Sequence, residues 1–168
     1  IRKAKDGGIK VTCEVTPHHL TLSDELVGGY DTDTKVNPPL RSRQDIECLR
    51  EALKDGTIDC IATDHAPHNL DSKDCEYSKA AFGISGIETA VAVIMNYLVI
   101  PGIITMEEMV RLFTIGPARI LGIDRGSLTV GNMADITILD PQVGKTVDPS
   151  RFYSKGKNNP YKGQKLQG

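Results

Sequence analysis

An apolar run in the middle of the chain leads directly into acidic and imidazole side chains. Residues 58–63 are mostly apolar, and Asp64, His65 and His68 follow them. Such a run predicts a buried strand, and in parallel α/β folds the loops after the strands build the active site. Asp64 there could ligate a cation and accept a proton from a water molecule. Taken alone, the pattern also fits an aspartate that caps a turn beside two surface histidines.

A second polar group follows another apolar run. His18 and His19 come soon after residues 9–15, which also read as a strand. Adjacent side chains point in different directions, so neighbouring histidines rarely bind one metal ion together. Shaping of the loop, for example through a bond to a backbone carbonyl, is therefore the favoured role, with metal ligation as the alternative.

Two further loops could present polar groups to a ligand. Asn37 is followed by two prolines, which fix the backbone and could hold its amide rigidly, although an ordinary Asn-Pro turn fits equally. Residues 81–86 contain two glycines, where backbone can approach a ligand closely. Their N–H groups lead into a predicted helix, a setting that favours anions and polar ring edges. A plain helix entry is the alternative.

Hydrophobic spacing predicts the elements that position these loops. Residues 9–15 and 58–63 are predicted strands. Between them, a helix is predicted from Ser42 to about Gly56, with Asp45 completing a weak form of the capping box. Strand, helix and strand joined by tight turns imply a parallel βαβ unit, and hence an α/β fold.

More helices are predicted after the long polar loop of residues 64–80. Ser85 and Glu88 form a capping box that predicts a buried helix to about Leu98. Two shorter helices follow, with these boundary residues: Thr105 and Glu108 as another capping box, Pro117 as the first residue of the last helix, and Gly122 as its end.

The last part of the chain changes in character. Residues 134–139 alternate enough to predict a strand, and residues 143–147 are expected to pair nearby. From Ser154 onward the sequence is rich in Lys, Asn and Gly. No final element is predicted there.

The composition argues against several classes of protein. The net charge of −2 argues against a basic surface that would bind nucleic acid or an acidic membrane. No apolar run is long enough to span a bilayer. The four cysteines form no C-x-x-C pair, which predicts reduced thiols in a cytoplasmic protein. The chain opens at Ile1 with what reads as the end of a helix, so the natural N-terminus is expected upstream.

Six segments in a fixed order carry a resemblance to a known family. They are CEVTPHHL (13–20), KVNPPLR (35–41), DGTIDCIATDHAPH (55–68), FGISGIET (82–89), GNMADITILD (131–140) and SKGKNNPYKGQKLQG (154–168). Together they closely resemble the class I dihydroorotases of the amidohydrolase superfamily, over essentially the whole chain. The resemblance implies a (β/α)₈ TIM barrel with a small β-rich domain built from the two chain ends.

The length of the chain limits how much of that fold it can hold. Such a barrel needs about 250 residues, and this chain has 168. The resemblance therefore implies the C-terminal part of a barrel at residues 1–124 and part of the β-rich domain at residues 125–168. Residues 9–15 would be the seventh barrel strand and residues 58–63 the eighth.

The resemblance also implies a reaction and a role for each matching residue. The reaction is the zinc-dependent, reversible hydrolysis of dihydroorotate to N-carbamoyl-L-aspartate, in cytoplasmic pyrimidine biosynthesis. Asp64 would be the last metal ligand and the catalytic proton carrier, while the other ligands of two zinc ions would lie upstream of this chain. The groups implied to bind the substrate are Asn37, His68 and the backbone of Phe82 and Gly83.

Two alternatives stay open from the sequence. One is a sister cyclic amidohydrolase, such as a dihydropyrimidinase or an allantoinase, which opens a different ring with the same metals. The other is a non-catalytic dihydroorotase-like partner of aspartate carbamoyltransferase, although retention of Asp64 argues against it. A second copy of the chain and that carbamoyltransferase are the protein partners to expect. By itself the chain is expected to be inactive and to fold poorly, because one carboxylate does not hold zinc and a partial barrel exposes strand edges.

Overall fold

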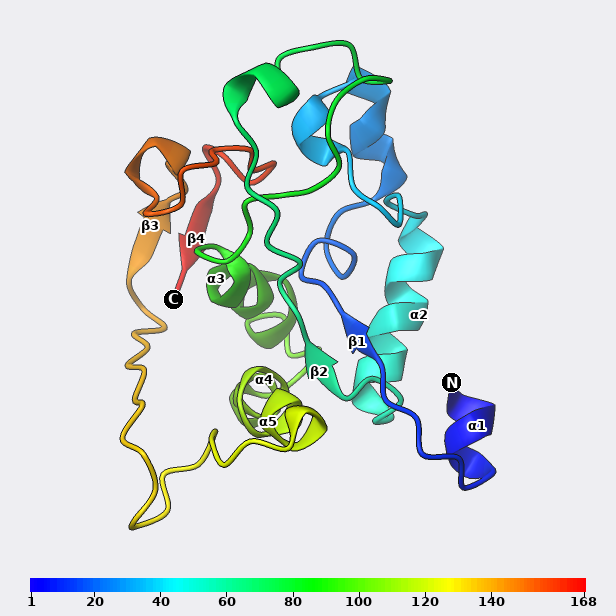
Figure 1. Ribbon diagram of the computed structural model, residues 1–168, viewed down its shortest axis with the longest axis vertical. Coiled ribbons are helices and arrows are strands. Elements are labelled where there is room, and N and C mark those ends of the chain that lie inside the picture. The colour runs from blue at the N-terminus through cyan, green and yellow to red at the C-terminus, as the bar shows by residue number, and fades with distance from the viewer.

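Two short parallel strands lie at the centre of the molecule, which the computed structural model describes over residues 1–168 (Figure 1). The strands β1 (Glu14–Val15) and β2 (Cys60–Ile61) pair with Val15 opposite Ile61. The helix α2 (Arg43–Lys54) lies between them in the sequence and covers one side of the pair. The predicted βαβ unit and the α/β class are therefore confirmed.

Both strands are shorter than predicted. Only two residues of 9–15 and two of 58–63 have strand pairing. The strand β1 has β2 as its sole neighbour, and Ile9 is 63% exposed. The first half of the segment 9–15 thus has neither a partner strand for its backbone nor a core for its side chains, and the prediction of a strand there is wrong.

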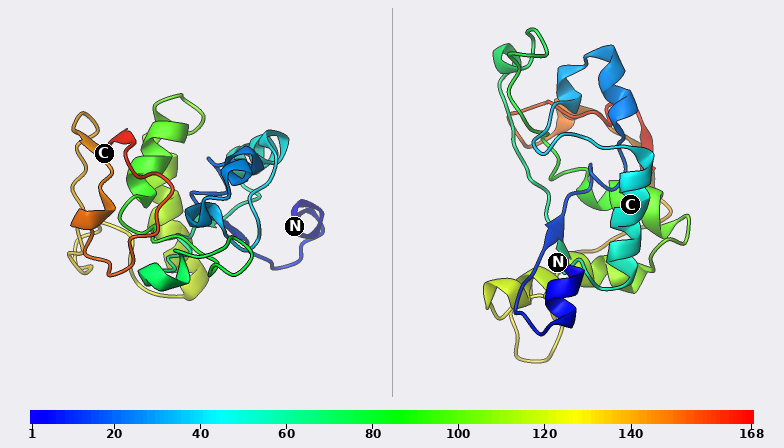
Figure 2. Two further views of the ribbon diagram at one scale, coloured as in Figure 1. Left: turned by 90° about the horizontal axis from the view of Figure 1, so that it is seen from above. Right: turned by 90° about the vertical axis from the view of Figure 1, so that its right-hand side faces the viewer.

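The predicted boundaries of α2 are confirmed. Ser42 is its N-cap, and the Ser42 and Asp45 side chains each bond the backbone of the other, which completes the capping box. Ile46 and Leu53 are buried on the inner face of the helix. A short helix, α1 (Arg2–Asp6), precedes β1 and buries none of its residues. It lies at the edge of the molecule in Figure 1 and in the left view of Figure 2, and Arg2 pairs with Asp55 at the end of α2.

The helix predicted from Ser85 begins later than expected. The helix α3 (Ala90–Ile94) continues as a π-helix, η4 (Met95–Val99). The Ser85 hydroxyl donates to the carbonyl oxygen of Gly156, and the Glu88 carboxylate accepts from backbone N–H groups of the C-terminal tail. The predicted capping box is wrong because the tail takes both side chains.

Two helices follow close to their predicted places. In α4 (Met106–Phe113) the capping box that begins at Thr105 forms as predicted. The next helix, α5 (Ile115–Leu121), ends at Gly122 in a left-handed conformation, also as predicted. Pro117 is its third residue rather than its first. None of the helices has the length and apolar character needed to cross a membrane.

The C-terminal part holds an antiparallel strand pair beside α3 (Figure 1). The strand β3 (Gly144–Thr146) pairs with β4 (Lys165–Gln167), so residues 143–147 do pair, but with the end of the chain, and the chain has a final element that was not predicted. Residues 134–139 form no strand. Ile136 and Ile138 are exposed, Ile138 by 91%, because no second strand lies beside them, whereas Leu139 packs partly against the core.

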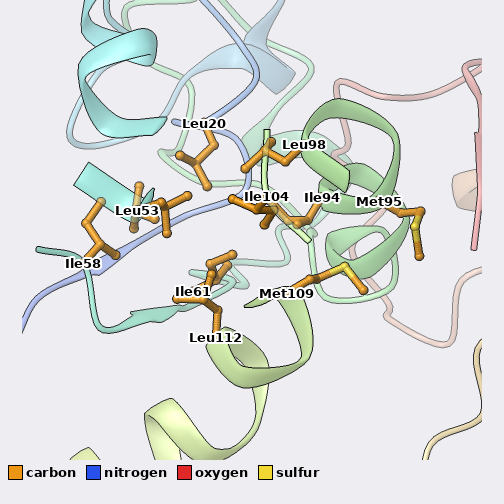
Figure 3. Packing of buried hydrophobic residues seen from close by; sticks show 11 residues of the cluster. Leu20, Leu53, Ile58, Ile61, Ile94, Met95, Leu98, Ile104, Met109 and Leu112 are labelled. Atoms are coloured by element: carbon orange, nitrogen blue, oxygen red, sulfur yellow. The ribbon is translucent and has the colours of Figure 1, made fainter. Parts of the chain in front are cut away.

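Two clusters of buried apolar side chains hold the elements together. The larger cluster joins β1 and β2 to α2, η4 and α4, and Figure 3 shows Ile61, Ile94 and Leu112 converging in it. The smaller cluster joins Ile84 to Tyr161 and Leu166 near the C-terminus. The loops that carry the predicted site therefore rest on a core that includes the last residues of the chain.

Candidate active site

Asp64 begins the loop that leaves β2. Its φ angle of 48° is in the left-handed region, which only one other non-glycine residue of the chain adopts. That conformation is strained for most residues and is more easily tolerated by Asp. Asp64 is exposed, and none of the ion pairs of the chain involves it. Its carboxylate is thus left free for a ligand from outside this chain.

The loop after Asp64 runs alongside the segment that contains Phe82 and Gly83. His65 and Ile84 form a parallel bridge, and the Ala66 N–H donates to the Ile84 carbonyl at 2.9 Å. The Ile87 N–H also donates to Nδ1 of His65 at 3.3 Å. The strand direction of β2 therefore continues into the loop and aligns the two segments that sequence reasoning selected separately.

His68 and the Phe82–Gly83 backbone are in direct contact. Nε2 of His68 lies 2.8 Å from the Phe82 carbonyl oxygen, which accepts its proton. Gly83 has a φ of 130°, and a Cβ at this position would lie 2.3 Å from Cβ of Ala66. Only glycine lets the two segments approach so closely. Three of the predicted site positions are thus brought together.

Asn37 is exposed in a neighbouring loop that His19 shapes. Nδ1 of His19 lies 2.6 Å from Oγ1 of Thr16, and Nε2 lies 2.9 Å from the Pro38 carbonyl oxygen. Because a carbonyl can only accept, Nε2 carries the proton and Nδ1 accepts from the threonine hydroxyl. This is the loop-shaping role predicted for a histidine here.

Lys35 ties the Asn37 loop to the Phe82 segment. Its carbonyl oxygen accepts the Gly83 N–H at 2.8 Å. Its buried ammonium group donates to the Ser78 and Ala80 carbonyls at 3.0 and 2.7 Å and lies 4.5 Å from the centroid of the Phe82 ring. Two carbonyls and an aromatic face compensate the buried charge.

His18 takes no part in this group. It is 2% exposed, and its Nε2 has no hydrogen-bond partner. Burial, with a smaller contribution from the neighbouring His19, lowers the pKa of His18 to about 3, so the ring is neutral at physiological pH.

A comparison with known proteins places the chain in a family. The sequence profile described as the amidohydrolase family matches residues 3–166, which is nearly the whole chain. The chain belongs to the amidohydrolase family.

Individual amidohydrolases match the chain along its whole length. A dihydroorotase of Caldanaerobacter subterraneus subsp. tengcongensis is 58% identical over all 168 residues, and those of Pelotomaculum thermopropionicum and Geobacter metallireducens are 56% and 51% identical. The chain spans 39% of the length of each of these relatives. Their names agree with the resemblance that the ordered segments carry.

Solved amidohydrolase structures share the fold. An L-hydantoinase (dihydropyrimidinase) from Arthrobacter aurescens superimposes with a TM-score of 0.93 at 31% identity, over 99% of this chain and 38% of that one. A dihydropyrimidinase from Brevibacillus agri gives a TM-score of 0.90 at 25% identity over the same shares of the two chains. The fold class predicted from the sequence is confirmed by these neighbours.

Amidohydrolases are generally metal-dependent. Within this chain no three His, Cys, Asp or Glu side chains gather as a metal-binding group. The free, exposed carboxylate of Asp64 fits one ligand of such a site, whereas His18 is buried and His19 is committed to Thr16 and Pro38. Asp64 therefore remains the predicted metal ligand of this chain.

One hollow lies mostly outside these loops. It measures about 700 Å³ between α4, α5 and residues 123–139, and most of its lining is apolar. Thr63 reaches its edge, but Asn37, His68 and Gly83 do not line it. The hollow lies beside the exposed segment 134–139, and we therefore interpret it as a gap between packed elements and not as the predicted site.

Sequence reasoning missed one residue that contacts the site loops. Asn158 bonds the backbone of Ala66, His68 and Gly83 from the far end of the chain. The C-terminal tail has no periodic pattern of hydrophobic residues that would predict an element there. The only signal for Asn158 was that it belongs to the segment 154–168, which contributes to the resemblance, and the resemblance assigned it no role.

Proposed function

We propose that this chain is part of a dihydroorotase, which hydrolyses dihydroorotate reversibly to N-carbamoyl-L-aspartate in pyrimidine biosynthesis. The observation that carries the proposal is the loop after β2, where Asp64 is free and His68 adjoins the Phe82–Gly83 backbone. Three relatives named dihydroorotase, at 51–58% identity, support dihydroorotate as the substrate. Since the chain spans 39% of their length, the activity is proposed for the complete enzyme, meaning this chain within a protein of its relatives' length.

Asp64 is assigned two roles in the proposal, as a zinc ligand and as a proton carrier. Two zinc ions would polarise the scissile carbonyl and lower the pKa of the attacking water. The Asp64 carboxylate would accept the proton that this water loses and then deliver it to the ring nitrogen that leaves. Its exposure and its freedom from ion pairs suit a group that must exchange protons.

Asn37, His68 and the Phe82–Gly83 backbone are assigned to the substrate. The Gly83 N–H already donates to Lys35, and the Gly83 carbonyl accepts from Asn158. A carbonyl oxygen has a second lone pair, so this one can still accept a ring N–H. The Asn37 amide can supply donors for the carbonyl and carboxylate oxygens of the ring. The His68 ring, whose Nε2–H is already given to the Phe82 carbonyl, offers Nδ1 as an acceptor for a ring N–H.

A hydantoinase or dihydropyrimidinase activity is the second candidate, because solved enzymes with those names share the fold at a TM-score of up to 0.93. Rates with dihydroorotate, dihydrouracil and hydantoin, measured on the complete enzyme with added zinc, separate the two. The proposal expects kcat/KM to be highest for dihydroorotate by at least about 100-fold, since dihydrouracil lacks the carboxylate that the site would hold. Higher kcat/KM for either of the other rings would reject it.

The cellular setting belongs to the same proposal. All four cysteines are free thiols, which supports a reducing cytoplasmic location. A homodimer and a complex with an aspartate carbamoyltransferase follow from the resemblance. Size-exclusion chromatography with light scattering, with and without the carbamoyltransferase, tests both partners.

A further inference from the structure

The C-terminal crossing segment (residues 154–159) runs across the loops assigned to the substrate. A Cβ at Gly156 would lie 2.5 Å from Cβ of Pro67 and 2.7 Å from the His68 nitrogen, so two backbones meet there with room for glycine alone. The Ser85 hydroxyl donates to the Gly156 carbonyl at 2.9 Å. The crossing segment is thereby fixed against both loops.

Asn158 lies at the centre of this contact. Its Nδ2 donates to the carbonyls of Ala66 and Gly83, both at 3.0 Å. Its Oδ1 accepts the His68 N–H at 3.0 Å, and the residue is 5% exposed. One buried amide thus joins three backbone groups of two loops, and His68 and Gly83 are both residues assigned to the substrate.

We propose that Asn158 is a positioning residue that sets the separation between His68 and Gly83, an inference that rests on the proposed dihydroorotase site. The bridge between His65 and Ile84 and the bond from His68 to the Phe82 carbonyl also join the two loops, and the Asn158 amide adds three bonds at the same place. Removing the amide leaves two carbonyls and one N–H without partners in a largely buried place. The loops would then move to find new partners. Asn158 acts on catalysis through His68 and Gly83.

The neighbouring Asn159 offers a matched control. It is 1% exposed, and its Nδ2 donates to the Ser85 carbonyl and to Oγ1 of Thr89, both at 3.1 Å. Its Oδ1 accepts the Tyr161 N–H at 2.9 Å. Its side-chain bonds equal those of Asn158 in number and depth, although one of them goes to a hydroxyl instead of a backbone carbonyl, and none of its partners is assigned to the substrate.

The test compares Asn158→Asp with Asn159→Asp in the complete enzyme, because each change removes two donors and keeps the shape of the side chain. Both variants are expected to lower the unfolding temperature to a similar extent. Asn158→Asp is expected to raise KM for dihydroorotate by about tenfold or more, with kcat within about threefold and zinc content unchanged. Asn159→Asp is expected to leave KM within about twofold.

Equal effects of the two substitutions on KM, or a loss of stability without a change in KM, would overturn the role of Asn158. If either Asp variant does not fold, Asn158→Ala and Asn159→Ala give the same comparison without an added charge. If the unaltered enzyme turns over dihydrouracil instead, the proposed substrate is wrong, and the same difference in KM is expected with dihydrouracil. An unaltered enzyme with no activity on either ring rejects the proposed function and the role of Asn158 together.

Discussion

Gly83 has a backbone conformation and a position that exclude any side chain. Its φ is 130°, and an added Cβ would lie 2.3 Å from the Ala66 Cβ, so Gly83→Ala must push the two loops apart by about 1 Å. A displacement of that size at a binding site can cost about 100-fold in rate. We therefore expect kcat/KM for dihydroorotate to fall by about 100-fold in steady-state assays.

Gly163→Ala separates this steric effect from the cost of a positive φ. Gly163 has a φ of 81° with no atom near the position of a Cβ. We expect it to lose about 1–2 kcal/mol of stability while kcat/KM stays within about threefold. If the two alanine variants have the same kcat/KM, the close approach of Gly83 to Ala66 is not what the site requires.

His18 predicts a loss of stability in acid. Its pKa of about 3 in the folded chain, caused by burial and then by His19, lies below its ordinary value of 6.5. Its contribution is therefore complete above pH 6.5 and is lost as the pH falls toward 3, because only the unfolded chain then binds the proton. At pH 5 the loss is about 2 kcal/mol.

Chemical denaturation of the complete enzyme at pH 7 and pH 5, with and without His18→Asn, measures this contribution. The substitution should lower stability at pH 7, since the ring is packed in the interior, but it should reduce the further loss between pH 7 and pH 5 by about 2 kcal/mol. Other groups titrate equally in both proteins, so the difference isolates His18. An unchanged loss between the two pH values would contradict the assignment.

At the residue scale, the sequence identified candidate site residues more readily than the contacts that hold them in place. Asp64 and His68 follow an apolar strand, which is a local signal, and the resemblance assigned their roles. That His68 lies against the Phe82 carbonyl depends on the bridge between His65 and Ile84, which joins segments far apart in the chain. A contact of this kind produces no repeating pattern of residues in either segment from which it could be predicted.

At the scale of elements, α5 packs against the start of β2 through a glycine. A Cβ at Gly116 would lie 2.7 Å from the Asp59 carbonyl oxygen and 2.9 Å from that of Arg111. Alanine favours a helix over glycine by about 1 kcal/mol, whereas forcing a methyl group into a filled contact costs about 1–3 kcal/mol. Both neighbours are backbone and cannot rotate away, so the clash should prevail and Gly116→Ala should destabilise the protein.

Thermal unfolding of the complete enzyme, with Gly28→Ala as the control, measures that balance. Nothing lies within 4 Å of a Cβ at Gly28, which is in a short exposed 3₁₀ helix. The control should leave stability unchanged or raise it by up to about 1 kcal/mol. If Gly116→Ala is as stable as the control, α5 can shift from β2 without cost and the close contact is not a constraint.

The elements predicted correctly are those with local signals. The capping boxes at Ser42 and Thr105 and the glycine end of α5 each depend on residues within one turn of the helix. The box predicted at Ser85 failed because distant tail residues compete for the same side chains. The strand β4 was missed for a related reason, since its pairing with β3 rather than its composition makes it a strand.

At the scale of the whole molecule, the apolar surface is more extensive than a self-sufficient domain would expose. Val130 and Ile138 are almost completely exposed, and the hollow of about 700 Å³ beside α4 and α5 is mostly apolar. Surfaces of this kind usually pack against another element. We therefore expect the chain produced alone to bind a hydrophobic dye such as ANS strongly, and the complete enzyme to bind it weakly.

The same chain produced alone should neither hold zinc nor turn over dihydroorotate. Structural and catalytic zinc sites use three or four protein ligands, whereas no three His, Cys, Asp or Glu side chains of this chain gather into such a group, and Asp64 is the one ligand that we propose here. Metal analysis after dialysis should therefore find far less than one zinc per chain, and assays should find no activity above background. The complete enzyme, prepared in parallel, should retain zinc and lose it, together with its activity, when Asp64 is replaced by Asn. If the chain alone held one zinc ion per molecule and turned over dihydroorotate, a full set of ligands would have to come from residues 1–168. That result would refute the proposal that the other ligands lie outside this chain.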